Sequence, residues 1–80
     1  MTYEQKQRFY TLARSIVRPD KKSEMEEILA EAEKAYDEKR MDKSYITAIG
    51  LRMMALIRTE CMVDFIKRGK ELAKEVDISY

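Results

Sequence analysis

The segment that most constrains the fold of this chain, residues 46–57, is apolar on both sides of a helix. At 100° per residue, one face carries Ile46, Ile49, Met53, Leu56 and Ile57. Much of the opposite face carries Ala48, Leu51, Met54 and Ala55. A single neighbouring helix covers only one of these faces. The segment is therefore predicted to be the central helix of a small bundle, or a helix that partly meets another chain.

Composition favours a single all-α domain over residues 1–80. Hydrophobic residues make up 45% of the chain and charged residues 39%, with two glycines and one proline. This combination is rich in helix formers and poor in turn material. A chain of 80 residues is near the lower limit for a core without disulfide or metal support. We see no internal repeat and no linker, so we expect one compact helical unit.

Two helices are predicted in the first half of the chain. The first covers 3–17 and begins after Thr2, which forms a capping-box pattern with the glutamine three residues later. It ends before Pro19, because proline disfavours the helical conformation in the residue that precedes it. The second covers 24–39 and follows Ser23, which forms the same kind of pattern with a glutamate.

A third helix, over 43–76, is predicted to start after the capping residue Asp42. Its apolar stripe changes face after Ile57, which two arrangements explain. A break near 58–60 would give a four-helix bundle, whereas one helix of roughly 34 residues would extend about 50 Å. No strong helix breaker occurs at the change of face. The sequence therefore favours three helices with a long third one, whose overhanging stripe would be exposed.

The stripe that continues past the change of face is the predicted protein interface. It consists of apolar residues and one flanking arginine: Leu51, Met54, Arg58, Met62, Phe65, Leu72 and Val76. Apolar anchors at helical spacing are typical of helix-face docking. We therefore expect a small protein-binding module of the inhibitor, immunity or regulatory type, with another protein as partner and with self-association into a homodimer.

The alternative is a nucleic-acid-associated protein that uses the first helix. Basic and aromatic residues alternate there on one stripe, and phosphate neutralisation and base stacking require both types: Tyr3, Lys6, Tyr10, Arg14 and Arg18. The chain has 16 Lys and Arg against 15 Asp and Glu, so its formal charge is only +1. Nucleic-acid binding would therefore depend on this local patch.

Residue types argue against catalysis. The chain has no histidine, which removes the usual general base and a common metal ligand. No phosphate-binding loop or zinc spacing is found, and Cys61 is the only cysteine. We therefore expect neither an enzyme nor a metal, cofactor or small-molecule substrate. The chain has no signal-peptide pattern and no apolar run long enough to cross a membrane, so we expect a cytoplasmic protein without membrane contact.

Overall fold

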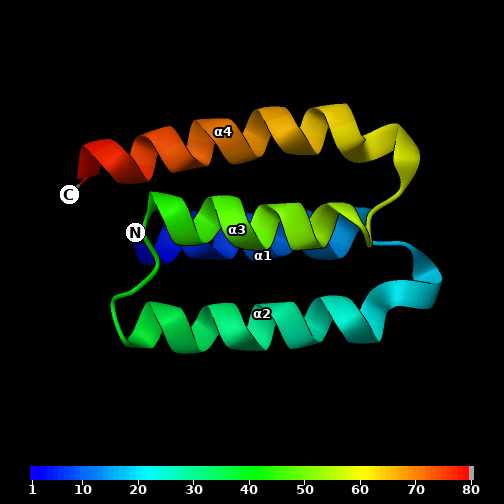
Figure 1. The fold of residues 1–80 in the computed structure, drawn as a ribbon, viewed down its shortest axis with the longest axis horizontal. Coiled ribbons are helices and arrows are strands. Elements are labelled where there is room, and N and C mark those ends of the chain that lie inside the picture. The colour runs from blue at the N-terminus through cyan, green and yellow to red at the C-terminus, as the bar shows by residue number, and fades with distance from the viewer. Residues whose placement is uncertain (80) are drawn as a thin grey trace.

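The computed structural model describes the backbone of residues 1–79 and the side chains of residues 1–76, and every described regular element is helical. The elements follow in the order α1 (Tyr3–Ile16), the 3₁₀ turn η1 (Pro19–Lys21), α2 (Lys22–Asp37), α3 (Lys43–Met54), the 3₁₀ turn η2 (Thr59–Cys61) and α4 (Met62–Ser79) (Figure 1). The all-α prediction is confirmed.

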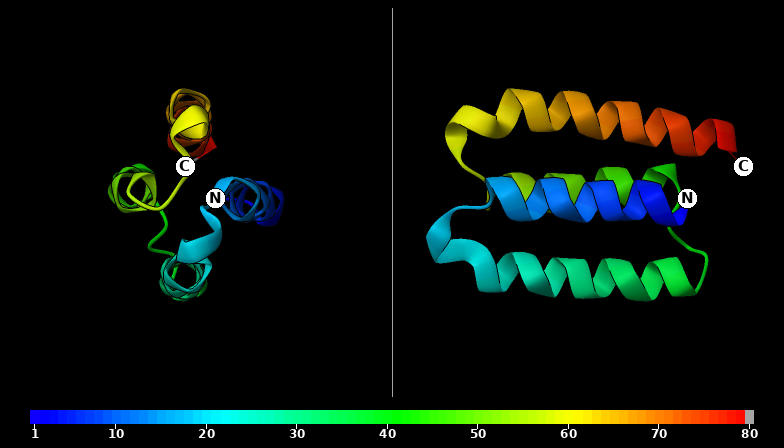
Figure 2. Two further views of the ribbon diagram at one scale, coloured as in Figure 1. Left: turned by 90° about the vertical axis from the view of Figure 1, so that its right-hand side faces the viewer. Right: turned by 180° about the vertical axis from the view of Figure 1, so that it is seen from behind.

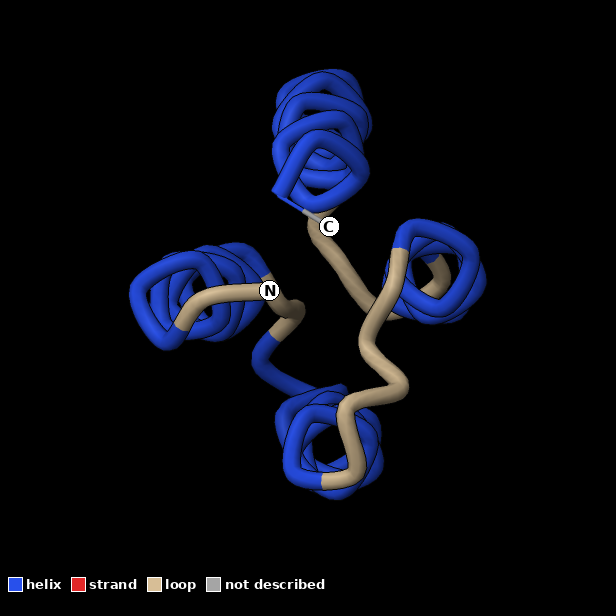
Figure 3. The backbone as a smooth tube through the Cα atoms, turned by 90° about the vertical axis from the view of Figure 1, so that its left-hand side faces the viewer, coloured by secondary structure: helices blue, strands red, loops and turns tan. Residues whose placement is uncertain are grey.

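The helices form an up-down-up-down bundle. Seen end-on, they occupy the corners of a square, with α1 diagonally opposite α3 and α2 diagonally opposite α4 (Figure 2). The N-terminus, the described end of α4 and the α2–α3 connection lie at one end of the bundle (Figures 1 and 3). Short connections make consecutive helices antiparallel neighbours, as is usual for bundles of this type.

The core runs along the long axis of the bundle and receives side chains from every helix. Its completely enclosed large residues include Met25, Met41, Ile46 and Met53. Phe9 of α1 and Phe65 of α4 stack across the core with ring centroids 6.5 Å apart. This core contains one of the two apolar faces of residues 46–57 and leaves Leu51, on the other face, exposed.

Two of the three predicted helix starts have the expected caps. The Thr2 hydroxyl accepts a hydrogen bond from the Gln5 backbone, and the Gln5 side chain accepts one from the Thr2 backbone. The Asp42 carboxylate accepts the backbone N–H of Tyr45 at 2.9 Å. The Ser23 cap is wrong, because η1 leads directly into α2 at Lys22 and no side chain caps that helix.

The favoured long helix over 43–76 is also wrong, since α3 and α4 are separate. The alternative break near 58–60 corresponds to the position of η2, although the helix already ends at Met54. No breaker residue is needed, because tertiary bonds replace the lost helical ones. The backbone N–H of Arg18 donates to Leu56 O at 2.9 Å, and that of Arg58 donates to Ile16 O at 3.0 Å.

These reciprocal bonds reveal an internal repeat that the sequence analysis did not detect. Residues forty positions apart have matching roles: Val17 pairs with Ile57 as an antiparallel bridge, and Arg18 and Arg58 have nearly identical backbone angles. The first residues of each pair of elements, α1 and α3, η1 and η2, and α2 and α4, are forty positions apart. The bundle is therefore built from two helical hairpins with the same order of elements, α1–α2 and α3–α4, although α3 and α4 lie closer together than α1 and α2.

Candidate functional site

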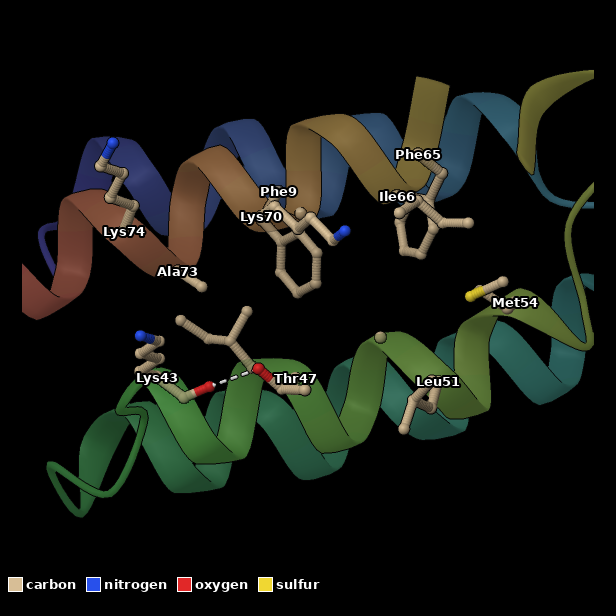
Figure 4. A pocket seen from close by; sticks show the side chains of 13 residues that line it. Phe9, Lys43, Thr47, Leu51, Met54, Phe65, Ile66, Lys70, Ala73 and Lys74 are labelled. Atoms are coloured by element: carbon tan, nitrogen blue, oxygen red, sulfur yellow. Dashed lines mark hydrogen bonds between the residues drawn. The ribbon is translucent and has the colours of Figure 1, made fainter. Parts of the chain in front are cut away.

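An open groove of about 640 Å³ runs along the outer side of the α3–α4 hairpin (Figure 4). We call it the α3–α4 groove. Thr47, Leu51 and Met54 line it from α3, and Ile66, Lys70 and Lys74 line it from α4. Its volume is in the range of ordinary ligand pockets. The groove is thus a concave surface formed by the two helices that the sequence had suggested were one.

One end of the groove is apolar. Leu51 is 67% exposed and Ile66 is 37% exposed, so two of the four exposed large hydrophobic residues of the described chain lie here. Met54 is half-buried beside them, and the buried rings of Phe9 and Phe65 contribute to the lining from beneath. Grouped exposed apolar side chains in a concavity are typical of binding surfaces, whereas isolated ones are not.

Two helical glycines keep the groove open. Gly50 in α3 and Gly69 in α4 both line it, and a Cβ atom built on either residue would meet nothing within 4 Å. Neither glycine is therefore required for close helix packing. Glycine is unfavourable in a helix interior by roughly 0.5–1 kcal/mol relative to alanine. The absence of side chains at these positions adds to the depth of the groove.

The other end of the groove is cationic. Lys43 of α3 and Lys74 of α4 lie at this end, and Lys70 lies between them and the apolar end (Figure 4). None of the described residues that line the groove is acidic, and helix α3 contains no Asp or Glu at all. The groove therefore runs from Lys43 and Lys74 at one end to Leu51 and Met54 at the other (Figure 4).

The matching surface of the α1–α2 hairpin is bridged by polar side chains. Where α3 and α4 carry Gly50, Met54 and Ile66, the residues forty positions earlier are Tyr10, Arg14 and Glu26. Arg14 forms two hydrogen bonds of 2.9 Å to Glu26 across the helices. The hollow that remains there measures about 330 Å³, roughly half the volume of the α3–α4 groove. The two hairpins thus share their order of elements but carry different surfaces.

The predicted nucleic-acid patch is largely occupied by intramolecular partners. Lys6 is 4% exposed, and its ammonium lies 3.0 Å from Glu33. Three tyrosine rings surround the Lys6 ammonium. Their centroids lie 4.8 Å (Tyr3), 5.8 Å (Tyr10) and 4.1 Å (Tyr36) from its Nζ atom. These tyrosine rings therefore form an aromatic cage around Lys6, a residue of the predicted patch itself.

Hydrogen bonds within this cluster shift its ionisation equilibria. Glu33 accepts hydrogen bonds from Lys6 and from the Tyr10 hydroxyl, which lower the pKa of its carboxyl group. Burial and the same bond to Glu33 raise the pKa of Tyr10. The hydrogen bonds from Arg14 likewise lower the pKa of Glu26. These shifts favour the charged carboxylates that hold α1 against α2.

Arg18, the last residue of the predicted patch, is also engaged. Its guanidinium donates a hydrogen bond of 2.7 Å to the carbonyl of Ala55, and Arg58 donates one of 3.0 Å to the carbonyl of Ser15. We call these two bonds the arginine clasp. They join the ends of α1 and α3 at positions that again differ by forty residues.

The predicted interface residues are divided between two environments. Leu51 and Met54 line the α3–α4 groove, whereas Arg58 is exposed and Met62 half-buried near η2. The other three are buried within the chain itself, because a separate α4 turns this stripe onto the core: Phe65, Leu72 and Val76. Only the rim of the predicted stripe is therefore available to a partner.

The sequence analysis missed the α4 wall and the cationic end of the groove. The groove residues that it did not select include Lys43, Thr47, Ile66, Lys70 and Lys74. The sequence did contain one signal for the groove. Both glycines in this half of the chain lie inside helices, and a helical glycine with no packing role leaves open space at the helix surface.

Among the described residues, no three Cys, Asp or Glu side chains gather as metal ligands, and Cys61 is a half-buried free thiol. No described helix is both long and apolar enough to cross a membrane. Comparison with protein-family models, with curated proteins and with solved structures finds no match to this chain.

Proposed function

We propose that this chain is a small protein-binding module that docks a helix of its partner in the α3–α4 groove. The observation that carries the proposal is the group of exposed apolar side chains on both walls of one open groove, above all Leu51 and Ile66. Docking of an amphipathic helix would bury these side chains, and apolar burial stabilises a complex by about 25 cal/mol per Å² before the costs of association.

The dimensions of the groove suit a helix. Lys43 and Met54 mark its ends on α3 and are separated by eleven helical residues, which corresponds to about 16 Å along the axis. A partner segment of about three turns spans this length, with apolar anchors at i, i+3 or i+4, and i+7. Such a helix would lie between α3 and α4 as an additional member of the bundle.

The groove is favoured over the α1 patch as the binding surface. Lys6 is buried among tyrosines and Arg14 is bonded to Glu26, so contact with phosphates would require these groups to leave their present partners. Self-association through the groove stays a prediction. Sedimentation of the chain over a range of concentrations tests it directly.

The chain itself supplies the design of a decisive variant. Met54→Arg with Ile66→Glu places across α3–α4 the same pair that Arg14 and Glu26 form across α1–α2. We call this double substitution the bridged variant. It preserves net charge and uses a pair that the other hairpin already accommodates. Ala48→Arg is the matched control, because Ala48 is exposed on α3 but does not line the groove.

The test is parallel capture from an extract of the source cells with the wild type, the bridged variant and the control. We expect a protein that is retained by the wild type and the control and lost with the bridged variant. Because docking is apolar, retention should change little between low and physiological salt. Capture of nucleic acid that all three forms retain equally, and that salt releases, would favour the α1 patch instead.

A further inference from the structure

We infer that the docked helix inserts one aromatic side chain into the α3–α4 groove beside Gly50 and Gly69. This inference rests on the proposed docking function and names the side chain that anchors the partner. Both glycines lie inside the helical stretches that line the groove, one in each wall. We call the space that their missing side chains leave the anchor hollow.

The floor of the groove consists of core side chains, two of which are aromatic. Phe9 and Phe65 are each only 3% exposed, yet both line the groove, so the groove reaches down to the core. Their rings stack on each other with centroids 6.5 Å apart. A third aromatic ring placed over them would gain stacking energy in addition to the energy of apolar burial. Aromatic side chains in well-packed pockets are also the residues that contribute most to binding at protein interfaces.

The first hairpin carries large side chains at the positions that correspond to the two glycines. Forty residues before Gly50 and Gly69 are Tyr10 and Leu29, which are 5% and 3% exposed. Helices α3 and α4 lie closer together than α1 and α2, but this closeness does not require glycine, because an added Cβ atom meets nothing within 4 Å. An aromatic side chain of the partner would therefore fill a space in α3–α4 that the chain itself leaves empty.

A second copy of the chain does not present such a helix. The four exposed large hydrophobic residues of the described chain are Tyr3, Leu51, Val63 and Ile66, and Tyr3 is the aromatic one among them. Tyr3 is the first residue of α1, and the other three lie on α3 and α4. Helix α1 therefore offers an exposed aromatic ring without the exposed large apolar residues one or two turns away that helix docking requires. The occupant that fits the groove is a helix of a different protein.

The experiment is a selection from a displayed library of helical peptides with randomised surface positions. The full chain is the target, and peptides that also bind the bridged variant are removed. We expect the recovered peptides to share an apolar face with Phe, Tyr or Trp at one fixed position. Circular dichroism and thermal unfolding of each variant establish that it is folded before its binding is interpreted.

The size of the anchor hollow is then changed from the side of the chain. Gly69→Ala should weaken binding of the recovered peptides by about tenfold, and Gly69→Leu by about a hundredfold, because each fills space that the aromatic ring needs. Gly69→Ala should at the same time raise the Tm, since the added methyl group meets no atom of the chain. Ala48→Leu is the matched control, because Ala48 is exposed on α3 but does not line the groove.

Each other outcome overturns a defined part of the argument. Peptides that are lost with the bridged variant but share no aromatic position, and that bind Gly69→Leu as well as the wild type, refute the aromatic anchor and leave groove docking intact. Failure to recover any peptide that distinguishes the wild type from the bridged variant refutes both. A wild-type dimer that Gly69→Leu dissociates and Ala48→Leu does not would identify a second copy as the occupant and refute the inference.

Discussion

Removing the arginine clasp should destabilise the bundle by an amount that can be estimated from its geometry. In Arg18→Ala, the backbone bond to Leu56 is retained but the guanidinium bond of 2.7 Å to Ala55 is lost. A hydrogen bond that involves a charged group contributes about 1.5–3 kcal/mol. The cation also lies near the carboxyl end of α3, where it interacts favourably with the helix dipole.

An opposing effect lowers this estimate for Arg18. The Nε atom of its guanidinium is buried and has no hydrogen-bond partner in the described structure, and alanine removes that cost of about 1 kcal/mol. We therefore expect Arg18→Ala to lower the free energy of unfolding by about 1.5 kcal/mol. Arg58 is 45% exposed and its bond to Ser15 is longer, so Arg58→Ala should cost about 1 kcal/mol.

Urea unfolding at neutral pH, followed by far-UV circular dichroism, measures these differences. A loss of about 1 kcal/mol corresponds to a decrease in Tm of roughly 4–8 °C for a domain of this size. Arg8→Ala is the control, because Arg8 is 67% exposed and forms only a surface ion pair with Glu75. If Arg18→Ala costs no more than this control, the guanidinium–carbonyl bond does not stabilise the fold and the reasoning is refuted.

Four further predictions concern stability. Glu33 has a lowered pKa, so its contribution to stability is complete above the ordinary carboxyl pKa and is lost as the pH falls through the lowered pKa. Between pH 7 and 3, the urea midpoint of the wild type should therefore fall further than that of Glu33→Gln. Equal losses would contradict a stabilising role for the hydrogen bond from Lys6 to Glu33. Gly69→Ala should raise stability by about 0.5–1 kcal/mol in the same assay, because the added methyl group meets no atom, and a loss would show hidden crowding. Lys39→Gly should raise the Tm, because Lys39 has a φ of 59°, a backbone angle that favours glycine. An unchanged or lower Tm would contradict backbone strain at Lys39. Phe65→Glu should unfold the chain, because Phe65 is 3% exposed and stacked on Phe9, and a folded variant by circular dichroism would place this ring outside the core.

The sequence correctly predicted those parts of the fold that depend on contacts between residues a few positions apart in the chain. The caps at Thr2 and Asp42 were visible because a capping residue bonds a backbone group only three positions away. The break after Met54 was not, since it depends on hydrogen bonds between segments forty residues apart in the chain. Residues 55–58 contain no helix breaker, and the hydrogen bond from the Arg58 N–H to Ile16 O stabilises the extended conformation of Arg58.

The same limit explains the outcome for the candidate sites. The spacing of Lys6 and Tyr10 correctly placed them on one face, but the sequence did not reveal that Glu33 of α2 would lie opposite them. A basic and aromatic stripe has the same pattern whether it meets phosphates or carboxylates from its own chain. For the interface, the stripe was recognised but its division between the core and the groove depends on the orientation of α4.

The two hairpins together provide the strongest argument that the groove is a binding surface. The two hairpins share their order of elements, and α1–α2 carries the charged pair Arg14–Glu26 across its helices. The corresponding positions of α3–α4 carry the apolar residues Met54 and Ile66 instead. Exposed apolar side chains and helical glycines each reduce solubility or stability when nothing covers them. The contrast between the hairpins is explained if an apolar helix face covers the second one, and the bridged variant tests that explanation.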